Sequence, residues 1–543
     1  MNAMKMMFSR ILPVWWHAST TRITVLLVML AGAAVAVGFE IYRPFPDDSG
    51  KVQSAPSNVT ISTATGSVVP VVAPLDPTNR FFDAKFGTNG QACVTCHLPS
   101  DGITVHVATI QNAFQASGGT DPLFRPNDTA NNPNIPLSSH TADDYSLILN
   151  LGVIRIGKTF TALAPLTAPN FTAAAADQTT IDKFGGPFPL GSGTNPIDPQ
   201  QGAGHATLSL FRRPLVNTNV HLDSSVLWDG RASIGNMRAQ VIGAAKTLLL
   251  ASSPTNDDAD QVAAFMLGVY TDQVFDTAAG TDAAGNCTFT APGQQCGAGL
   301  VSARGAGAGV QNLLRLALSP NVPCTNFLET APSAGGVGCV SNTSGYDLFD
   351  SWASLPNDGT NAGRLAVVRG QDIFNTAMLQ VPADLAGQFG QGVTQINCTT
   401  CHTTRNIGNN PDATFFRRVG TDSPDIIEGL IGSSTGPTHD DLVALLARVS
   451  QLPLYQLTAT GSNTCGITTA VTTDPGRAMV SGDICDVGKF KPPILRGVAA
   501  RSPYFHAGTA ENIQMLIHFY NARFQIGLNE DQVNDLGAFV EAQ

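Results

Sequence analysis

The stretch "QACVTCHLPS", residues 91–100, holds two cysteines separated by two residues and followed at once by a histidine. The same pattern returns far along the chain in "INCTTCHTTR", residues 396–405. Two thiols about one helical turn apart suit thioether bonds to the two vinyl groups of a haem, and the histidine then lies under the iron as its proximal ligand. The pattern therefore predicts two covalently bound haem c groups, one on Cys93, Cys96 and His97 and one on Cys398, Cys401 and His402.

Two other kinds of site also use closely spaced cysteines. Zinc usually recruits four ligands from paired cysteines or from cysteine and histidine clusters. A redox dithiol does not require the histidine that follows the second cysteine. Because the complete Cys-x-x-Cys-His pattern occurs twice, we favour haem attachment over both alternatives.

Length and composition bound the other expectations. A chain of 543 residues that is 43% hydrophobic and 13% charged should form two or three domains with buried cores. Its 53 glycines and 34 prolines predict long, turn-rich connections. The net charge of −11 argues against a nucleic-acid partner and suits either a basic electron-transfer partner or simply a solvated acidic surface.

The N-terminus resembles an export segment. Lys5, Arg10 and Arg22 precede an apolar run over residues 23–39, which fits a signal peptide cut after Ala34–Ala36. The run is also near the lower length limit for a membrane span, so an uncleaved anchor stays open as the alternative. In either case we expect a periplasmic or extracellular protein, and in the second case one anchored to the inner membrane through residues 23–39.

The remaining six cysteines lie in sequence-local pairs within segments rich in glycine, serine and threonine. In an oxidising compartment such pairs indicate disulfides. The expected bridges are Cys287–Cys296, Cys324–Cys339 and Cys465–Cys485, although the sequence alone leaves other connectivities open.

The predicted fold class is mainly α, with two cytochrome c-like haem domains, long loops and a disulfide-stapled insertion. Aromatic and aliphatic residues precede each motif, in "TNRFFDAKFG" and "LAVVRGQDIF", and predict a short helix before each haem. Further helices are expected over 259–275, 509–524 and 529–543. The expected organisation is a signal peptide or anchor (1–42), a linker (43–77), a first haem domain (78–275), a Cys/Gly-rich insertion (276–360) and a second haem domain (361–543).

Three further stretches resemble a known superfamily. "VLWDGRAS" (226–233) resembles the Trp-Asp-Gly-Arg loop of bacterial di-haem cytochrome c peroxidases and of MauG, a di-haem enzyme that matures a tryptophan-derived cofactor. "RRPLVNTN" (212–219) resembles the strand-like lead into that loop, and residues 473–521, which include "RSPYFHAGTAENIQMLIHFYN", resemble the C-terminal haem segment. With both haem motifs in the right order, the resemblance spans roughly 80–543 without the insertion at 276–360.

The resemblance implies different tasks for the two haems. The first would meet a small oxidant, peroxide or oxygen, and the second would pass electrons from a redox protein or small donor. Trp228 would relay electrons between them, or would simply be a buried loop tryptophan. Arg231 would pair with a haem propionate, or would form an ion pair with Asp229 that stabilises the turn.

The chain also departs from the family pattern near the first haem. The family has a glutamine and then a glutamate after the tryptophan, but here Gln240 is displaced, Leu250 takes the glutamate position and no acid follows before Asp257. General acid–base catalysis is therefore in doubt, and we expect weak peroxidase turnover. Arg212 stands where the family has an asparagine that helps to bind calcium, so no calcium site is expected.

The resemblance also bears on the sixth ligand of the second haem. Tyr520 lies fourteen residues after His506, at the position where peroxidases have methionine and MauG has tyrosine. His506 and His518 are alternatives, and Tyr520 could also be a core aromatic. His106 is either a switchable ligand of the first haem or a surface histidine.

These features together predict an exported di-haem c-type oxidoreductase that resembles peroxidases and MauG. Two alternatives stay open. One is a non-enzymatic electron-transfer cytochrome c, and the other is a di-haem oxygenase that resembles the rubber oxygenases.

Overall fold

The computed structural model describes much of the chain from residue 61 onward. The described residues are 61–63, 66–72, 76–125, 129–132, 134–136, 138–159, 161–184, 207–218, 220, 223, 225–276, 345–346, 349–357, 359, 361–403, 410 and 412–543. In this part of the chain, no helix is long and apolar enough to cross a membrane. The apolar run 23–39 and the expected disulfides Cys287–Cys296 and Cys324–Cys339 lie outside the described residues.

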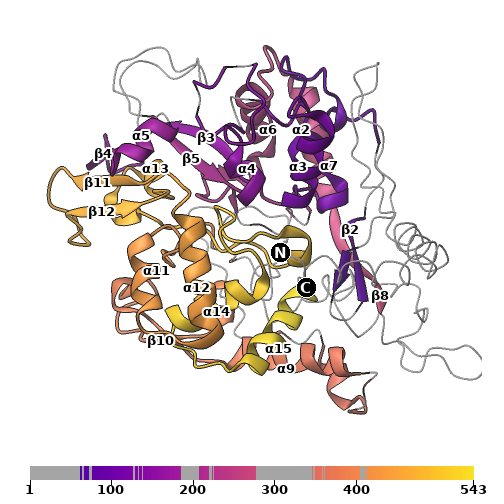
Figure 1. The fold of residues 1–543 in the computed structure, drawn as a ribbon, viewed down its shortest axis with the longest axis vertical. Helices are drawn as coiled ribbons and strands as arrows, with labels where there is room; N and C mark the ends of the chain where they lie inside the picture. Colours follow the sequence, from indigo (N-terminus) through magenta and orange to yellow (C-terminus); the bar gives the residue numbers. More distant parts are fainter. Residues whose placement is uncertain are drawn as a thin grey trace, which may run out of the picture. The chain divides into compact units, whose positions relative to one another are not determined.

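The first half of the chain mixes short helices and strands (Figure 1). In chain order, its elements are β1 (Ile61–Thr63), β2 (Gly66–Val72), η1 (Arg80–Phe82), α2 (Cys93–Cys96), η2 (Pro99–Asp101), α3 (Val107–Ser117), α4 (Ser146–Leu151), β3 (Ile154–Thr159), β4 (Phe171–Ala175), α5 (Gln178–Phe184), β5 (Thr207–Arg212), β6 (Ser225–Val226), β7 (Ala232–Ser233), η4 (Ile234–Asn236), α6 (Met237–Thr247), α7 (Asn256–Gly268) and β8 (Tyr270–Asp276).

The second half is richer in helix (Figure 1). Its elements are η5 (Asp350–Ser354), α9 (Ala362–Thr376), β9 (Leu379–Gln380), η6 (Ala383–Leu385), β10 (Gln395–Ile396), α10 (Cys398–Cys401), α11 (Pro424–Ile431), α12 (Gly436–Val449), β11 (Tyr455–Ala459), β12 (Thr469–Thr472), α13 (Ala478–Ser481), η7 (Ile484–Asp486), η8 (Val498–Arg501), α14 (Ile513–Arg523) and α15 (Glu530–Glu541).

Helix accounts for 42% of the described residues, and the strands form small sheets. The sheet orders are β1-β2-β8, β12-β11-β4, β3-β5, β6-β7 and β9-β10. The expected helical character is thus confirmed in part. The helices before the two haem motifs differ, because the first is the three-residue η1 and the second is the fifteen-residue α9.

Helix α7 begins three residues before the expected start at residue 259 and ends at Gly268, before the expected end at residue 275. The Thr255 hydroxyl accepts a hydrogen bond from the Asp258 backbone N–H at 3.1 Å, and the Asp258 carboxylate accepts one from the Thr255 N–H at 3.1 Å. This capping box satisfies N–H groups that the first turn leaves free. The expectation of helix to residue 275 was wrong beyond Gly268, because residues 270–276 form β8 and pair with β2.

The two predicted C-terminal helices are confirmed as α14 and α15. Asn512 and Asn529 cap them through side-chain oxygens that accept hydrogen bonds from backbone N–H groups. Helix α15 also packs closely on α9, where a Cβ atom on Gly370 would lie only 1.9 Å from the carbonyl oxygen of Asp535. A glycine is therefore required at this crossing.

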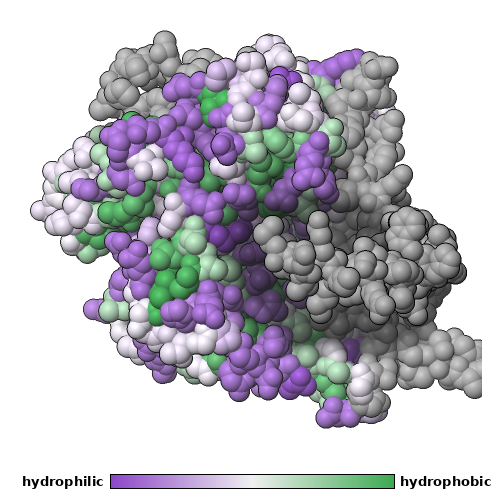
Figure 2. Space-filling model, in the orientation of Figure 1, coloured by the Kyte–Doolittle hydropathy of each residue, from purple (hydrophilic) through white to green (hydrophobic). Residues whose placement is uncertain are grey.

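Helix α12 packs on α14 and α11 packs on α12. Ile427 of α11 and Leu442 and Leu445 of α12 are buried in the same hydrophobic cluster as α14. The outer side of the pair keeps some apolar surface, including Val443, whose side chain is 45% exposed. Figure 2 shows this green patch over α11 and α12.

Strand β4 joins the two halves of the chain. It pairs with β11 in antiparallel register from Phe171 opposite Ala459 to Ala175 opposite Tyr455. The buried Tyr455 hydroxyl donates to the carbonyl of Ser209 at 2.9 Å. Residues of the first half therefore complete a sheet whose other two strands, β11 and β12, come from the second half.

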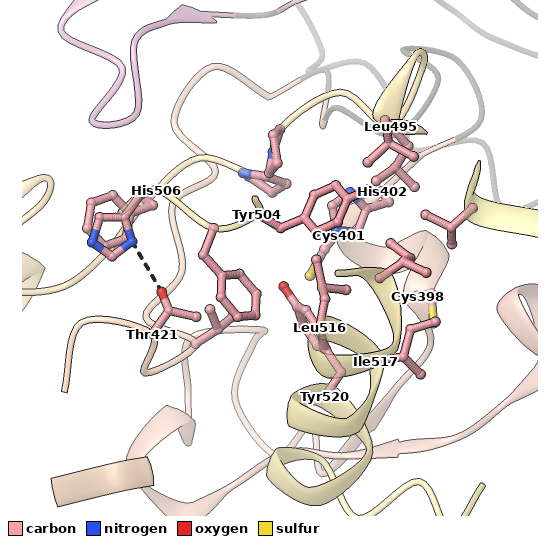
Figure 3. Close-up of a pocket in the computed structure, with 18 of the residues that line it drawn as sticks. Cys398, Cys401, His402, Thr421, Leu495, Tyr504, His506, Leu516, Ile517 and Tyr520 are labelled. Carbon is pink, nitrogen blue, oxygen red and sulfur yellow. Dashed lines mark hydrogen bonds between the residues drawn. The ribbon is translucent and has the colours of Figure 1, made fainter. Parts of the chain in front are cut away.

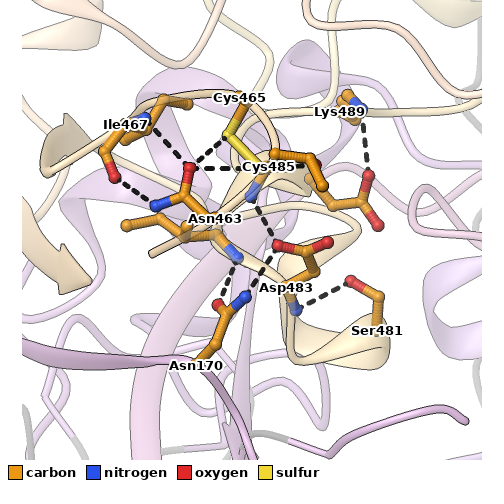
Figure 4. Close-up of a disulfide and its surroundings, with 11 residues drawn as sticks. Asn170, Asn463, Cys465, Ile467, Ser481, Asp483, Cys485 and Lys489 are labelled. Carbon is orange, nitrogen blue, oxygen red and sulfur yellow. Dashed lines mark hydrogen bonds and ion pairs between the residues drawn. A yellow bond between two sulfur atoms is a disulfide. The ribbon is translucent and has the colours of Figure 1, made fainter. Parts of the chain in front are cut away.

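The predicted disulfide Cys465–Cys485 is present beside this sheet (Figure 4). It links the β11–β12 connection to η7. Asp483 lies next to it and accepts a hydrogen bond from the Asn170 amide at 2.9 Å, so this staple also contacts the first half of the chain.

Two expected boundaries look different in the structure. Residues 61–63 and 66–72, within the expected linker 43–77, form β1 and β2. At the end of the expected insertion 276–360, Tyr346, Phe349 and Trp352 are buried in the same hydrophobic cluster as α9, α14 and α15. This end of the segment therefore packs with the C-terminal core.

Candidate haem sites

The two Cys-x-x-Cys-His motifs adopt the same local structure. Each pair of cysteines begins and ends a single helical turn, α2 or α10. The N–H of His97 donates to the carbonyl of Cys93 at 3.1 Å, and that of His402 donates to the carbonyl of Cys398 at 2.9 Å. Local hydrogen bonding thus arranges two thiols and one imidazole in the same way at both places, which is what repeated haem attachment requires.

The cysteines at both motifs are compatible with thioether formation. Among the described residues, the disulfide Cys465–Cys485 uses none of the four motif cysteines. Burial raises the pKa of Cys93, Cys398 and Cys401 to about 12. These thiols are therefore uncharged at neutral pH until they react.

His97 has the hydrogen-bonding state that a metal ligand needs. Its Nδ1 lies 3.0 Å from the carbonyl oxygen of Ile103, which can only accept a hydrogen bond. Nδ1 therefore carries the proton and Nε2 keeps the lone pair. Burial lowers the pKa of His97, which favours this neutral form. The first motif thus fits an iron ligand at Nε2.

The second motif opens into a cavity formed by both halves of the chain (Figure 3). Cys398, Cys401 and His402 line one part of it. Its walls are otherwise largely apolar, and α14 with its C-cap residue Phe524 contributes Ile513, Leu516, Ile517, Tyr520 and Phe524. An apolar cavity beside the two thiols and the imidazole fits the macrocycle of a haem.

Three arginines in the cavity wall lack a carboxylate partner among the described residues; Arg213 is buried, and Arg417 and Arg501 are half-buried. Arg213, Arg417 and Arg501 all line the cavity, and no carboxylate of the described residues lies within ion-pair distance of them. Among the described residues, their guanidinium groups donate hydrogen bonds to backbone carbonyls, such as that of Gly152 at 2.7 Å from Arg213 Nη1. Burial lowers the pKa of Arg213 and Arg501 to about 10. Buried cations need an anion nearby, and the two propionates of a haem would supply it.

Tyr520 lies within this cavity. Its side chain rises from α14, and its hydroxyl points into the space beside Cys401 and His402 (Figure 3). Burial raises the pKa of Tyr520 well above its usual range. Its ring stacks on Phe524 with centroids 5.8 Å apart. The structure therefore brings the expected sixth ligand and the second motif to one cavity, and the ligation itself stays a prediction.

The two alternative ligands lie in different surroundings. His506 lines the cavity, with Nδ1 3.3 Å from the Thr421 hydroxyl and its ring stacked on Phe490. Burial lowers the pKa of His506 to about 4, so it is neutral. His518 is not among the cavity-lining residues, and its Nδ1 lies 2.7 Å from the carboxylate of Asp441 on α12. Of the two, only His506 shares the cavity.

The loop that carries Trp228 is held by both halves of the chain. The Trp228 indole Nε1 donates to the carbonyl of Arg213 at 3.0 Å, and the Trp228 carbonyl accepts from the N–H of Lys491 at 3.0 Å. Trp228 lines the same cavity as the second motif. Both hydrogen bonds fix the loop, so the indole is kept at the cavity wall.

Buried charges anchor the same loop. Arg212 Nη1 lies 2.6 Å from Asp229, and Arg212 Nε lies 2.6 Å from Asp474. Arg231, expected to face a propionate, forms an ion pair with Asp229 through Nε at 2.9 Å, which is the turn-stabilising alternative. Burial alone would raise the pKa of Asp229, but Arg212 and Arg231 outweigh it and hold this pKa well below its usual range.

The residues expected near the first haem are more scattered. Gln240 is half-buried on α6 and does not line the second cavity. Leu250 follows α6, and its carbonyl accepts a hydrogen bond from the Thr88 hydroxyl at 2.9 Å. Arg238 pairs with the exposed Asp260. His106 begins α3, where its Nε2 contacts the carbonyl of Ala500. The roles expected of Gln240, Leu250 and His106 at the first motif stay predictions.

Sequence reasoning missed the cavity arginines. Arg213 stands directly after Arg212 in the quoted segment 212–219, and Arg501 starts the segment that leads to His506. A charged residue inside an otherwise apolar stretch was the available signal. Nothing local to Arg417 indicated that it would line the cavity.

The comparisons with known proteins agree with a haem protein of the peroxidase type. No protein-family model matches the chain. The cytochrome-c peroxidase IdrP1 of Denitromonas iodatirespirans is 40% identical over 68 residues, which cover 10% of this chain and 18% of that protein. The match supports a distant relationship to the cytochrome c peroxidase family and is consistent with an oxidoreductase.

Proposed function

We propose that this chain is an exported oxidoreductase with two haem c groups, similar in kind to di-haem peroxidases and MauG. The observation that carries the proposal is the cavity at the second motif. It combines Cys398, Cys401 and His402 with the cations Arg213 and Arg501, which have no carboxylate partner among the described residues, in largely apolar walls. The equivalent local structure at Cys93–His97 supports a second attachment site.

The protein residues hold and orient the two groups. The four cysteines would attach them covalently, and His97 and His402 would be iron ligands. Tyr520 would be a further ligand at the second motif, and Arg213, Arg417 and Arg501 would balance the propionate charge. When bound, a haem supplies a one-electron couple and an iron coordination position, which no side chain here provides.

Trp228 serves as the relay between the two motifs. The proposal rests on its place in the cavity wall and on the two hydrogen bonds that fix it, to the Arg213 carbonyl and from the Lys491 N–H. The buried ion pairs of Arg212 with Asp229 and Asp474 keep the loop in this position.

The reacting site at the first motif accepts a small oxidant, peroxide or oxygen. Gln240 can donate or accept a hydrogen bond but cannot act as an acid, and Leu250 offers no proton. Cytochrome c peroxidase turnover is therefore weak, and the physiological reaction uses another oxidant or an additional substrate. The lack of an acid at Gln240 and Leu250 also favours the second candidate function, electron transfer without catalysis.

The protein works in the periplasm or outside the cell and receives electrons from a redox protein or small donor. The N-terminal run 23–39 supports export. The disulfide Cys465–Cys485 gives independent support, because disulfides persist in oxidising compartments. Cell fractionation tests this, and recovery of the haem-loaded protein from the cytoplasm would contradict it.

Haem content tests the central proposal. After denaturation and acid–acetone extraction, the wild-type polypeptide should retain two haems, and the Cys398→Ala, Cys401→Ala variant should retain one. The Cys465→Ala, Cys485→Ala variant is the matched control, because it removes two cysteines outside the motifs and should keep two haems. A wild-type content of one haem or none refutes the proposal.

Electron paramagnetic resonance then separates the two candidate functions. An oxidoreductase should show a high-spin signal from an open iron position at the first motif, and that signal should change after peroxide is added. Two low-spin signals that do not change after peroxide is added would instead support an electron-transfer cytochrome.

A further inference from the structure

Hydrogen bonds connect the first motif to the wall of the second cavity. His97 Nδ1 lies 3.0 Å from the carbonyl oxygen of Ile103. The hydroxyl of the next residue, Thr104, donates to the carbonyl of Pro214 at 2.8 Å. The residue before that proline, Arg213, accepts the indole N–H of Trp228 at 3.0 Å. Because Ile103–Thr104 and Arg213–Pro214 are chain neighbours, these three bonds form one continuous path from His97 to Trp228.

The path runs through the protein interior. Thr104 is 1% exposed, Ile103 is fully buried and Arg213 is 4% exposed. The loop that carries Thr104 is closed on itself, because the Leu98 N–H donates to the Thr104 carbonyl at 2.7 Å and the Ile103 N–H donates to the Leu98 carbonyl at 2.8 Å. Water therefore does not compete for the central bond from Thr104 to Pro214, which is fully buried, whereas the bonds at the two ends of the path are part-buried.

The carbonyl that orients His97 is held against the backbone's own preference. Ile103 has a φ of 56°, in the left-handed region that β-branched residues rarely adopt. Such a conformation persists only where the surroundings enforce it. Here the Ile103 carbonyl also accepts the N–H of Asn217 at 3.3 Å. The segment 213–217 thus contacts the loop of the first motif at two points, Ile103 and Thr104.

We infer that Thr104 is a positioning residue that couples His97 to Trp228. Its hydroxyl joins the loop that carries the His97 acceptor to the segment that carries the Trp228 acceptor. The inference rests on the proposed haem at each motif. The transfer it serves moves one electron, so the reduced haem of the second motif is oxidised and the oxidised haem of the first is reduced. No bond forms or breaks and no proton moves.

The Thr104→Val variant tests this coupling in the haem-loaded, full-length protein. Valine keeps the shape of threonine but removes the hydroxyl, so the Pro214 carbonyl loses its donor. We expect intramolecular electron transfer after flash reduction to slow several-fold and the reduction potential of the first haem to shift, with two haems retained. Thr104→Ser restores the hydroxyl and should return both values to those of the wild type.

Thr129→Val is the matched control. The Thr129 hydroxyl is equally buried, with 1% exposure, and donates to the backbone carbonyl of Leu123 at 2.8 Å, but it lies off the path. Its transfer rate should equal that of the wild type. Equal slowing in Thr104→Val and Thr129→Val would show a general structural effect and overturn the inference.

A double-variant cycle examines whether Thr104 and Trp228 act on one path. Trp228→Phe removes the indole N–H, so either change alone breaks the path. The double variant should then be no slower than the slower single variant, whereas independent routes would give additive slowing. Additive slowing, or a wild-type rate in Thr104→Val, refutes the coupling.

Two controls keep the result decisive. Haem content is measured first, and fewer than two haems in the wild type would refute the proposed function rather than the coupling. If Thr104→Val does not fold, Thr104→Ser carries the test, because it keeps the hydroxyl and loses only a methyl group. Slowed transfer in a folded Thr104→Ser variant would then overturn the inference.

Discussion

The buried ion pairs beside the tryptophan loop give the sharpest stability prediction. Arg212→Met removes the guanidinium that lies 2.6 Å from both Asp229 and Asp474 and keeps a side chain of similar length. The side chains involved are at most 4% exposed. Asp229 keeps Arg231 as a partner, but among the described residues the Asp474 carboxylate keeps only uncharged donors such as the Gly476 N–H at 2.8 Å.

The size of the effect follows from burial. Breaking a buried ion pair by removing one partner typically costs about 3–5 kcal/mol, because a charge remains in the interior without compensation. Exposed pairs contribute less than about 1 kcal/mol. Arg238→Met is thus the matched control, since it removes an arginine that pairs with Asp260 on the surface.

The pH dependence has a definite sign. The pKa of Asp229 is held below its usual range in the folded protein, so this carboxylate stabilises the fold above its unfolded pKa of about 3.9. That stabilisation is lost as the pH falls through the lower folded pKa. In Arg212→Met, burial still raises the pKa of Asp229, but Arg212 no longer lowers it, so the folded pKa of this carboxyl is higher. The midpoint of acid unfolding should therefore move to higher pH.

Urea unfolding of the haem-loaded proteins at pH 7, followed by circular dichroism, measures the free energies. We expect Arg212→Met to lose about 3–5 kcal/mol and Arg238→Met less than about 1 kcal/mol. A loss below about 1 kcal/mol for Arg212→Met, with an unchanged acid midpoint, would refute the view that this network holds the loop.

Three other predictions concern the sites and the staple. Tyr520→Phe should shift the low-spin resonance of one haem while His518→Ala leaves it unchanged; the opposite result would reassign the ligand. Leu250→Glu should raise steady-state peroxide reduction, by up to about 10²–10⁴-fold if the new acid reaches the oxidant, and robust turnover by the wild type would contradict the reasoning. Replacing Cys465 and Cys485 with serine should lower the free energy of unfolding by about 2–4 kcal/mol, and an unchanged urea midpoint would show that the staple is dispensable.

The parts of the fold that sequence predicted are those fixed by near neighbours. The haem motifs, the disulfide Cys465–Cys485 and the C-terminal helices α14 and α15 depend on residues a few positions apart or on a short loop. Strand β8 was predicted as helix because its partner β2 lies about 200 residues earlier in the chain. The sequence of residues 270–276 does not by itself indicate that this segment pairs with β2.

The candidate site also contains residues that the sequence could indicate and residues that only the tertiary fold brings together. The family resemblance, counted fourteen residues on from His506, pointed to Tyr520, and α14 brings this residue to the cavity of the second motif. The cavity arginines Arg213, Arg417 and Arg501 come from three separate segments, so their meeting depends on the tertiary fold. Ile103 gave no signal at all, because a backbone carbonyl can orient a histidine whatever side chain it carries.

The pairing of β4 with β11 also has a consequence for biogenesis. A chain that emerges from its N-terminus presents β4 long before β11 exists, and contacts between such distant segments form slowly. Until β11 has been synthesised, β4 has no partner strand in this sheet. The residues of the first half that line the second cavity are then not yet held in position. The thiols of Cys398 and Cys401, which are half-buried in the folded chain, are accordingly more accessible for haem attachment before this sheet forms. A variant that closes this sheet sooner should mature with less haem at the second motif, even though its folded state is unchanged.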